Sequence, residues 1–359
     1  MSFVADSLMV IIGCDFHPGF QQIAVLDTES GEVRDLRLAH QQQAREFYAG
    51  LQGKEVLVGV EACGYTQWFE QMLEGLGHRF QIGDAAAIRA SYVRKQKTDR
   101  RDAGHILRLL VEGRFPALWA PSPSQRDARQ LIVHRHKRVQ MRTRVKNQLH
   151  ALAINQGLRL RRQLWTREGR RQLEALQLLP YAAARRADLL RQLDEMDGQI
   201  AELDKMVRQE AEARAEVVRL MSHPGVGPVT ALAFVLTIGD AGRFRHACQV
   251  ASYLGLIPAE RSSGGKQRLG HITKQGSPLL RLLLVEAAHG AVRGDAELSR
   301  CYTRLQRRHS TGVAKVAVAR KLALRLYWML RNQADYAQLR GPYAGKPVSF
   351  CGRQTRPVA

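Results

Sequence analysis

Four carboxylates stand at places in the sequence where α/β proteins build catalytic sites. Asp15 closes the apolar run LMVIIGCDF, and Glu61 closes a second apolar run, VLVGVEACG. Strand ends carry side chains to the rim of a sheet, where such proteins form their sites. Asp99 and Asp102 stand three residues apart in KQKTDRRDAGHI. This spacing places both on one face of a helix, with Cβ atoms about 5–6 Å apart.

Carboxylates gathered at one place repel one another by roughly 1–4 kcal/mol per close pair. Such a cluster persists when it is protonated or when a cation neutralises it. Oxygen ligands favour Mg²⁺ or Mn²⁺, which stabilise the charge that develops in phosphoryl transfer. The sequence therefore predicts a Mg²⁺ or Mn²⁺ site formed by Asp15, Glu61, Asp99 and Asp102. The alternative is that each acid pairs with a nearby arginine or caps a helix, and for Asp99 a helix cap is the stronger prediction.

The first hundred residues alternate strand and helix patterns that position these acids. Strands are predicted at 8–16, 21–28, 32–40, 56–64 and 78–84, and helices at 41–52, 66–77 and 99–113. The order β-β-β-α-β-α-β-α predicts an α/β domain over residues 1–115 with its first strand in the centre. The proline-rich segment PALWAPSPSQ, at 116–125, marks the boundary of this domain.

The rest of the chain has helical patterns. An apolar seam with the a/d spacing of a coiled coil consists of Leu189, Leu193, Met196, Ile200, Leu203 and Val207. The seam is short, so a two-chain zipper and a helical hairpin within one chain both remain open. We expect a basic helical or coiled-coil linker domain at 116–220, a mainly α-helical domain at 221–340 that includes the polar loop 258–278, and a flexible tail at 341–359.

Charge is distributed unevenly along the chain. The net charge is +22, but residues 1–90 carry −6 and the remaining residues carry +28. A strongly basic body indicates a polyanionic partner, with nucleic acid as the first candidate and general solubility as the plainer alternative. The chain has no run of eighteen apolar residues, and its five scattered cysteines have no C-x-x-C spacing. We therefore expect a cytoplasmic protein with no membrane span, no disulfide framework and no zinc ribbon.

The basic helical segment 126–171 has closely spaced arginines and few aromatic residues, a pattern that follows phosphates and does not stack bases. Duplex DNA and structured RNA both satisfy it. PGVGPVTA at 224–231 resembles a phosphate-binding helix-hairpin-helix turn, although a simple helix–helix turn is equally consistent. The candidate nucleic-acid-binding residues are Lys95, Lys97, Arg100, Arg101, Arg135, Lys137, Arg138, Arg142, Arg144, Lys146, Gly225, Gly227, Lys266 and Arg268.

Several long motifs together resemble one known family. GCDFH with Asp15, GVEACGYTQWFE with Glu61, and KTDRRDAGHILRLL with Asp99 and Asp102 resemble the DEDD motif of the insertion-sequence transposase family numbered one hundred and ten, which includes the Piv-type invertases. The similarity covers about residues 10–340, because HPGVGPVTALAF, ASYLGLIPAERSSGGKQ and KQGSPLLRLLLVEAA look like the family's second transposase domain. The resemblance implies a RuvC-like, ribonuclease H-like N-terminal domain.

The resemblance also implies a chemistry: a bacterial DNA recombinase that joins a serine nucleophile to the four metal-binding acids. The family's serine maps to Ser263, with Ser262 as an unresolved neighbour, and Lys266 and Arg268 are positioned in sequence to neutralise a phosphate. The implied partners are element ends and target DNA, a structured guide RNA encoded by the element, and further copies of the chain in a dimer or tetramer. Two alternatives remain: a RuvC-like nuclease that uses water, and a non-catalytic nucleic-acid-binding protein.

Overall fold

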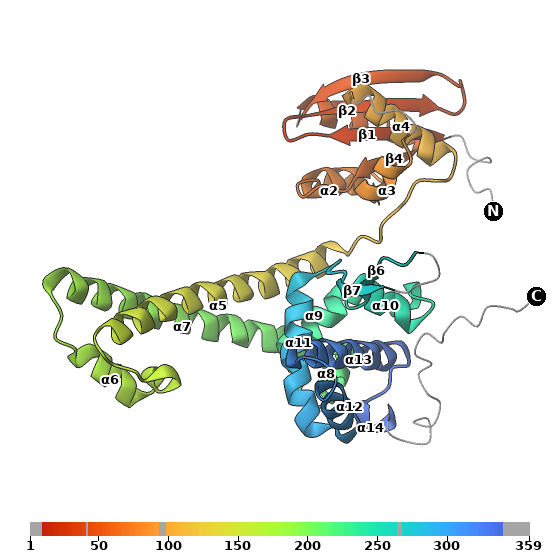
Figure 1. Cartoon of the computed structure of the whole chain (residues 1–359). Coiled ribbons are helices and arrows are strands. Elements are labelled where there is room, and N and C mark those ends of the chain that lie inside the picture. The colour runs from red at the N-terminus through yellow and green to blue at the C-terminus, as the bar shows by residue number, and fades with distance from the viewer. Residues whose placement is uncertain (1–8, 41, 93–97, 264–267, 340–359) are drawn as a thin grey trace, which may run out of the picture. The chain divides into compact units, whose positions relative to one another are not determined.

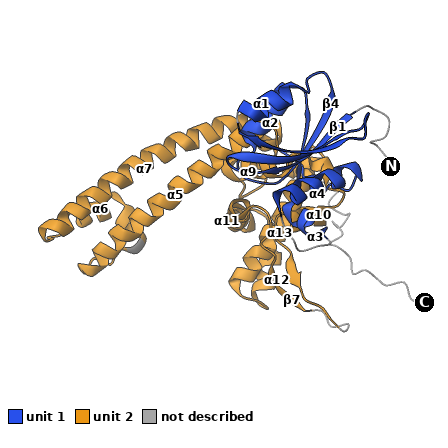
Figure 2. Cartoon of the chain, turned by 90° about the horizontal axis from the view of Figure 1, so that it is seen from above, with its two compact units in different colours: residues 1–120 blue, residues 121–359 orange. Residues whose placement is uncertain are grey.

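The chain folds into two compact units, residues 1–120 and 121–359, which Figure 2 colours separately. The structure is a computed structural model that describes residues 9–40, 42–92, 98–263 and 268–339 (Figure 1). The predicted α/β start followed by a mainly helical remainder is confirmed. The predicted tail 341–359 lies outside the described residues, and the finer division into domains 116–220 and 221–340 stays a prediction.

A mixed five-stranded sheet forms the centre of the first unit, in the order β3-β2-β1-β4-β5. The strands are β1 (Met9–Phe16), β2 (Phe20–Asp27), β3 (Val33–Ala39), β4 (Glu55–Glu61) and β5 (Arg79–Gly83). The central strand β1 pairs antiparallel with β2 and parallel with β4, with Cys14 opposite Val60. The parallel pairing brings the carboxyl ends of β1 and β4 to the same edge of the sheet.

Helices cover both faces of this sheet. They are α1 (Gln42–Ala49), α2 (Gln67–Gly75), α3 (Ala85–Ala90) and α4 (Asp99–Val111). Cys14 and Val60 belong to the apolar core that contains Phe69 of α2, whereas Ile11 and Leu57 belong to the core that contains α4. The sequence prediction missed α3, because six residues are too few to show a helical period; the Asp84 side chain caps it.

Two long helices, α5 (Pro123–Asn155) and α7 (Pro180–Glu212), pack side by side in the second unit, with α6 (Arg167–Ala175) at the end away from α9 (Pro228–Ile238) (Figure 1). Leu189 and Leu193 are buried against residues of α5 such as Val145 and Leu149. The apolar seam is therefore covered within one chain, as the hairpin alternative predicted. Coiled-coil geometry stays a prediction.

Most of the remaining elements form a helical body around α13 (Thr311–Arg331). They are α8 (Ala215–Met221), η2 (Ala241–Arg243), α10 (Ala247–Tyr253), β6 (Pro258–Glu260), β7 (Leu269–Ile272), α11 (Pro278–Gly294), α12 (Ala296–Gln306) and α14 (Tyr336–Leu339). The short helix η1 (Arg161–Trp165) instead packs with α6. The sequence predicted a polar loop at 258–278. This prediction is wrong in one respect, because the segment contains the antiparallel pair β6–β7. These strands are short and largely exposed, so they leave no apolar alternation in the sequence. No helix in the described ranges has both the length and the apolar character needed to cross a bilayer.

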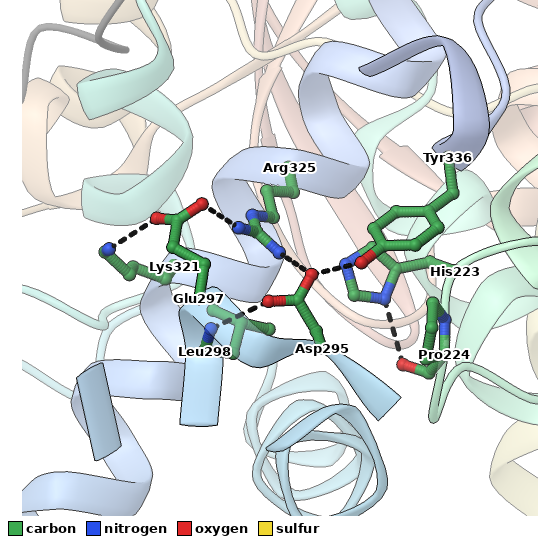
Figure 3. A network of polar contacts seen from close by, with 8 residues as sticks. All are labelled: His223, Pro224, Asp295, Glu297, Leu298, Lys321, Arg325 and Tyr336. Atoms are coloured by element: carbon green, nitrogen blue, oxygen red, sulfur yellow. Dashed lines mark hydrogen bonds and ion pairs between the residues drawn. The ribbon is translucent and has the colours of Figure 1, made fainter. Parts of the chain in front are cut away.

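A buried polar network connects α14, the last helix that the structure describes, to this helical body (Figure 3). Asp295, only 1% exposed, accepts hydrogen bonds from the Tyr336 hydroxyl, from Arg325 at 2.8 Å and from the Leu298 amide at 2.7 Å. Burial by itself raises the pKa of Asp295, but these hydrogen bonds outweigh it and lower the pKa to about 2. The Tyr336 ring also lies against His223, with ring centroids 4.5 Å apart.

Asp295→Asn is expected to lower the free energy of unfolding at pH 7 by about 2 kcal/mol, because the pKa of Asp295 lies below its unfolded value. A carboxylate whose pKa is lower in the folded state than in the unfolded state stabilises the fold at pH values above its unfolded-state pKa. This contribution is lost as the pH falls from about 4 to about 2. The difference between wild type and variant should therefore shrink over that interval in urea unfolding followed by circular dichroism. Glu202→Gln, at an exposed position of α7, is the control. A difference that does not change with pH would contradict the network's role.

Candidate active site

Asp15 and Glu61 lie at the carboxyl edge of the sheet, near the end of β1 and at the end of β4. Side chains alternate between the two faces of a strand. Because Cys14 and Val60 point into the core on the α2 face, Asp15 and Glu61 point to the α4 face. The two carboxylates therefore belong to adjacent strands and the same face, at the edge where the sequence predicted them.

Two glycines let α4 lie unusually close to this face. A Cβ atom on Gly13 would lie 2.3 Å from the Ala103 carbonyl oxygen and 2.3 Å from the Leu107 amide nitrogen. On Gly59 it would lie 2.8 Å from the Leu110 side chain. Since real Cβ atoms do not approach backbone atoms this closely, only glycine fits at position 13 without moving the helix. The first turn of α4 is thereby held beside the strand ends.

That first turn carries Asp99 and Asp102. Thr98 is the N-cap of α4, and its hydroxyl accepts from the Arg101 amide at 3.4 Å. The prediction that Asp99 caps the helix is therefore wrong: threonine provides the cap, and Asp99 is the first helical residue, half exposed. Asp102 is only 5% exposed and accepts a hydrogen bond from the Tyr92 hydroxyl at 2.5 Å.

The electrostatic environment shows that Asp99 and Asp102 act on Asp15. Burial raises the pKa of Asp15, His17 opposes this, and the charges of Asp102 and Asp99 raise it further. Burial, the hydrogen bond to Asp102 and the charges of Asp102, Asp15 and Glu61 likewise raise the pKa of Tyr92. A divalent cation would relieve this repulsion, so the cluster has the charge that such an ion requires.

Glu61 has a cationic neighbour as well, because Arg89 approaches one of its oxygens to 3.8 Å. The side chains of Asp15, His17 and Asp99 each offer a ligand atom, and these atoms lie within 4.8 Å of one another. The sequence prediction missed His17 and Tyr92. A signal existed for His17, since residues two apart on an extended chain point the same way.

The serine loop lies in the second unit, at the β6–β7 hairpin. The Ser262 hydroxyl donates to Glu260 at 2.5 Å and accepts from the Arg268 amide at 3.1 Å, so this side chain closes the hairpin. Ser263 is exposed. Lys266, which was predicted to neutralise a phosphate, lies outside the described residues.

The predicted nucleic-acid-binding residues fall into different environments. Arg135 and Arg142 connect α5 to α7 through Asp204 at 2.6 Å and Asp197 at 2.9 Å. Lys146 lies over the Trp165 ring, 4.9 Å from its centroid. Lys137, Arg144 and Arg101 are exposed, Arg138 is partly buried, and Arg100 pairs with Asp35 at 2.7 Å. Lys95 and Lys97 lie outside the described residues.

Gly225 and Gly227 lie in the turn before α9. Gly225 has φ +81°, and a Cβ atom there would lie 2.2 Å from the Ala291 amide nitrogen of α11. Close packing of the turn against α11 therefore explains the glycine at 225. Gly227 is the N-cap of α9. A phosphate-binding role for this turn stays a prediction.

Comparison with known proteins covers both units. A DEDD transposase profile matches residues 12–154, and a profile described as the transposase IS116/IS110/IS902 family matches residues 217–303. A probable family 20 transposase of Pseudomonas aeruginosa is 31% identical over 342 residues, which are 90% of this chain and 98% of the relative. The chain belongs to the IS110 family of transposases. Its family thus consists of enzymes that cut and rejoin DNA.

Other relatives match the transposase over most of its length. The transposase for insertion sequence element IS1111A of Coxiella burnetii is 28% identical over 334 residues, 91% of each chain. The transposase for insertion sequence element IS1328 of Yersinia enterocolitica is 26% identical over 285 residues, 77% of this chain and 84% of the relative. The sequence resemblance to this family is confirmed.

Gly13→Ala is expected to destabilise the first unit by about 3 kcal/mol, because the new methyl group meets α4 backbone that must move away. Gly59→Ala should cost less, since the Leu110 side chain is flexible. Gly19→Ala, with no atom within 4 Å of the added Cβ, is the matched control. Urea unfolding of the full chain tests this, and equal effects of Gly13→Ala and Gly19→Ala would contradict the close approach of α4.

Lys137→Ala and Arg144→Ala are each expected to reduce the slope of log affinity against log salt for duplex DNA by about 1, because each exposed cation is predicted to neutralise one phosphate. Arg142→Ala should instead weaken the α5–α7 hairpin, since its guanidinium is engaged with Asp197. Fluorescence anisotropy at several salt concentrations measures the slopes. Equal slope changes in all three variants would show that the ion pair to Asp197 does not matter.

Proposed function

We propose that this transposase cuts and rejoins DNA at the ends of its insertion sequence through a covalent phosphoserine intermediate. Ser263 is the nucleophile. Asp15, Glu61, Asp99 and Asp102 hold Mg²⁺ or Mn²⁺. The proposal is supported by the position of Asp15 and Glu61 near the ends of adjacent parallel strands, on the face covered by the helix that begins with Asp99 and includes Asp102, in a chain of a DEDD transposase family.

The bound cation would stabilise negative charge on the phosphate oxygens. The Ser263 oxygen attacks phosphorus and its proton passes to a base. The bond from phosphorus to the sugar oxygen of the departing strand breaks, and that oxygen takes up a proton. The reverse reaction with a different strand end rejoins DNA and frees the serine. Each step exchanges one phosphate ester for another, so strand exchange needs no nucleotide.

The hairpin supports Ser263 over Ser262 as the nucleophile. The Ser262 hydroxyl already makes two hydrogen bonds within the loop, to Glu260 and from Arg268. Ser263 is exposed and stands next in the chain. Both serines are exposed, so exposure does not separate them; the Ser262 hydroxyl would have to give up its bonds within the hairpin to attack a phosphate.

Nucleic-acid partners follow from the charge and the family. We propose that exposed cations of α5, such as Lys137 and Arg144, contact the phosphates of element DNA or of a structured guide RNA that selects the target. A dimer or tetramer would supply the several strand cuts that a transposition requires. The proposed DNA and RNA partners rest on the basic charge of the chain and on family membership.

A second candidate is a RuvC-like nuclease in which water attacks the phosphate. One observation favours it: all four acids lie in the first unit, so a metal-dependent cut needs no residue of the serine loop. In this case the second unit would only bind nucleic acid.

The two candidates differ in a product that can be isolated. The full chain is incubated with labelled element ends, Mg²⁺ and the RNA that co-purifies with it, and denaturing gels reveal DNA attached to protein. Wild type and Ser262→Ala should form the adduct, whereas Ser263→Ala and Asp102→Asn should lose it. An adduct lost only in Ser262→Ala would assign the nucleophile to Ser262, with Glu260 accepting its proton. Free cleavage products that survive Ser263→Ala would identify the nuclease.

A further inference from the structure

His17 lies at the acid cluster, just after the strand that carries Asp15. Its Nε2 atom is 3.2 Å from Oδ2 of Asp15 and 3.6 Å from Oδ2 of Asp99. The three candidate ligand atoms lie within 4.8 Å of one another. Two ligands on opposite sides of one ion, with bonds of about 2.1 Å, are about 4.2 Å apart. Small side-chain movements would therefore close this set around a single cation.

The imidazole of His17 is held in this orientation by its neighbours. Its ring stacks on Phe20, with centroids 4.6 Å apart and an interplanar angle of 23°. The Arg37 guanidinium lies over the same Phe20 ring, 3.8 Å from its centroid. The backbone amide of His17 donates to the Phe20 carbonyl oxygen at 3.0 Å, which closes the turn between β1 and β2. A ligand that is oriented before the ion binds loses little freedom on binding.

We infer that His17 is a nitrogen ligand of the carboxylate centre, and that the centre therefore binds Mn²⁺ more tightly than Mg²⁺. The inference rests on the proposed function, because it takes the four acids as the metal centre. Mg²⁺ is a hard ion that prefers oxygen ligands and keeps several waters, whereas first-row transition metals accept imidazole more readily. An all-oxygen cluster would discriminate less between the two ions.

The test is metal binding by the full-length transposase, which needs neither DNA nor RNA. Mn²⁺ is titrated and the free ion is followed by electron paramagnetic resonance, with Mg²⁺ as the competitor. His17→Ala should raise the dissociation constant for Mn²⁺ about tenfold, with a much smaller change for Mg²⁺. Pulsed measurements should show coupling of bound Mn²⁺ to a nitrogen nucleus in the wild type, and this coupling should disappear in the variant.

Two further variants separate ligation from general damage to the site. His17→Gln replaces the nitrogen by an amide oxygen, so it should retain binding of both ions while losing the nitrogen coupling and the preference for Mn²⁺. His40→Ala removes a nearby imidazole that packs against Phe16 and Trp68, with ring centroids 4.6 and 5.0 Å away. His40→Ala should keep the nitrogen coupling.

The outcomes distinguish this inference from the proposed function. Nitrogen coupling that persists in both His17 variants, or equal losses of Mg²⁺ and Mn²⁺ affinity in His17→Ala, would overturn the role of His17. Asp102→Asn tests the carboxylate centre itself. If it weakens Mn²⁺ binding while His17→Ala does not, only the histidine assignment fails. If the wild type binds no Mn²⁺, or if Asp102→Asn has no effect, the proposed metal centre fails as well.

Discussion

The close approach of α4 to the sheet is the constraint on which the acid site depends. Gly13 provides no side chain between β1 and the backbone of α4, so the helix rests almost on the strand. With α4 there, Asp102 is buried, and the charges of Asp102 and Asp99 help to raise the pKa of Asp15. The packing that stabilises the unit therefore also concentrates negative charge, which a proton or a cation can balance.

The basic residues of α5 fall into two groups that composition alone does not separate, those engaged in ion pairs with α7 and those that are exposed. Some arginines of α5 hold the long hairpin together, as Arg135 does through Asp204 and Arg142 through Asp197. Others, such as Arg144, are exposed on the same helix. A guanidinium engaged with a carboxylate has less charge to offer a phosphate, so the surface available to nucleic acid is smaller than the net charge suggests.

In the second unit, polar groups organise the structure. Asp295 caps α12 and also receives Arg325 and Tyr336, which connects α12, α13 and α14 around one buried carboxylate. At the β6–β7 hairpin, Ser262 has a comparable local role with Glu260. Ser262 therefore closes the hairpin through its own side chain, although it is as exposed as its neighbour Ser263.

Sequence periodicity by itself determined the strand order of the first unit, its helices apart from α3, its central first strand, and the placement of Asp15 and Glu61 at strand ends. These features depend on alternation and spacing within short segments. The long motifs also led to the transposase family, which the comparisons confirm. Only the tertiary structure decided that Thr98, and not Asp99, caps α4, that Tyr92 and His17 join the acids, and that the apolar seam of α7 is covered by α5. The seam contacts of α7 and the bond from Tyr92 to Asp102 depend on packing between separate segments, and no local pattern records which surfaces meet. The Thr98 cap and the His17 contact are local, but residue type alone did not decide between neighbouring candidates.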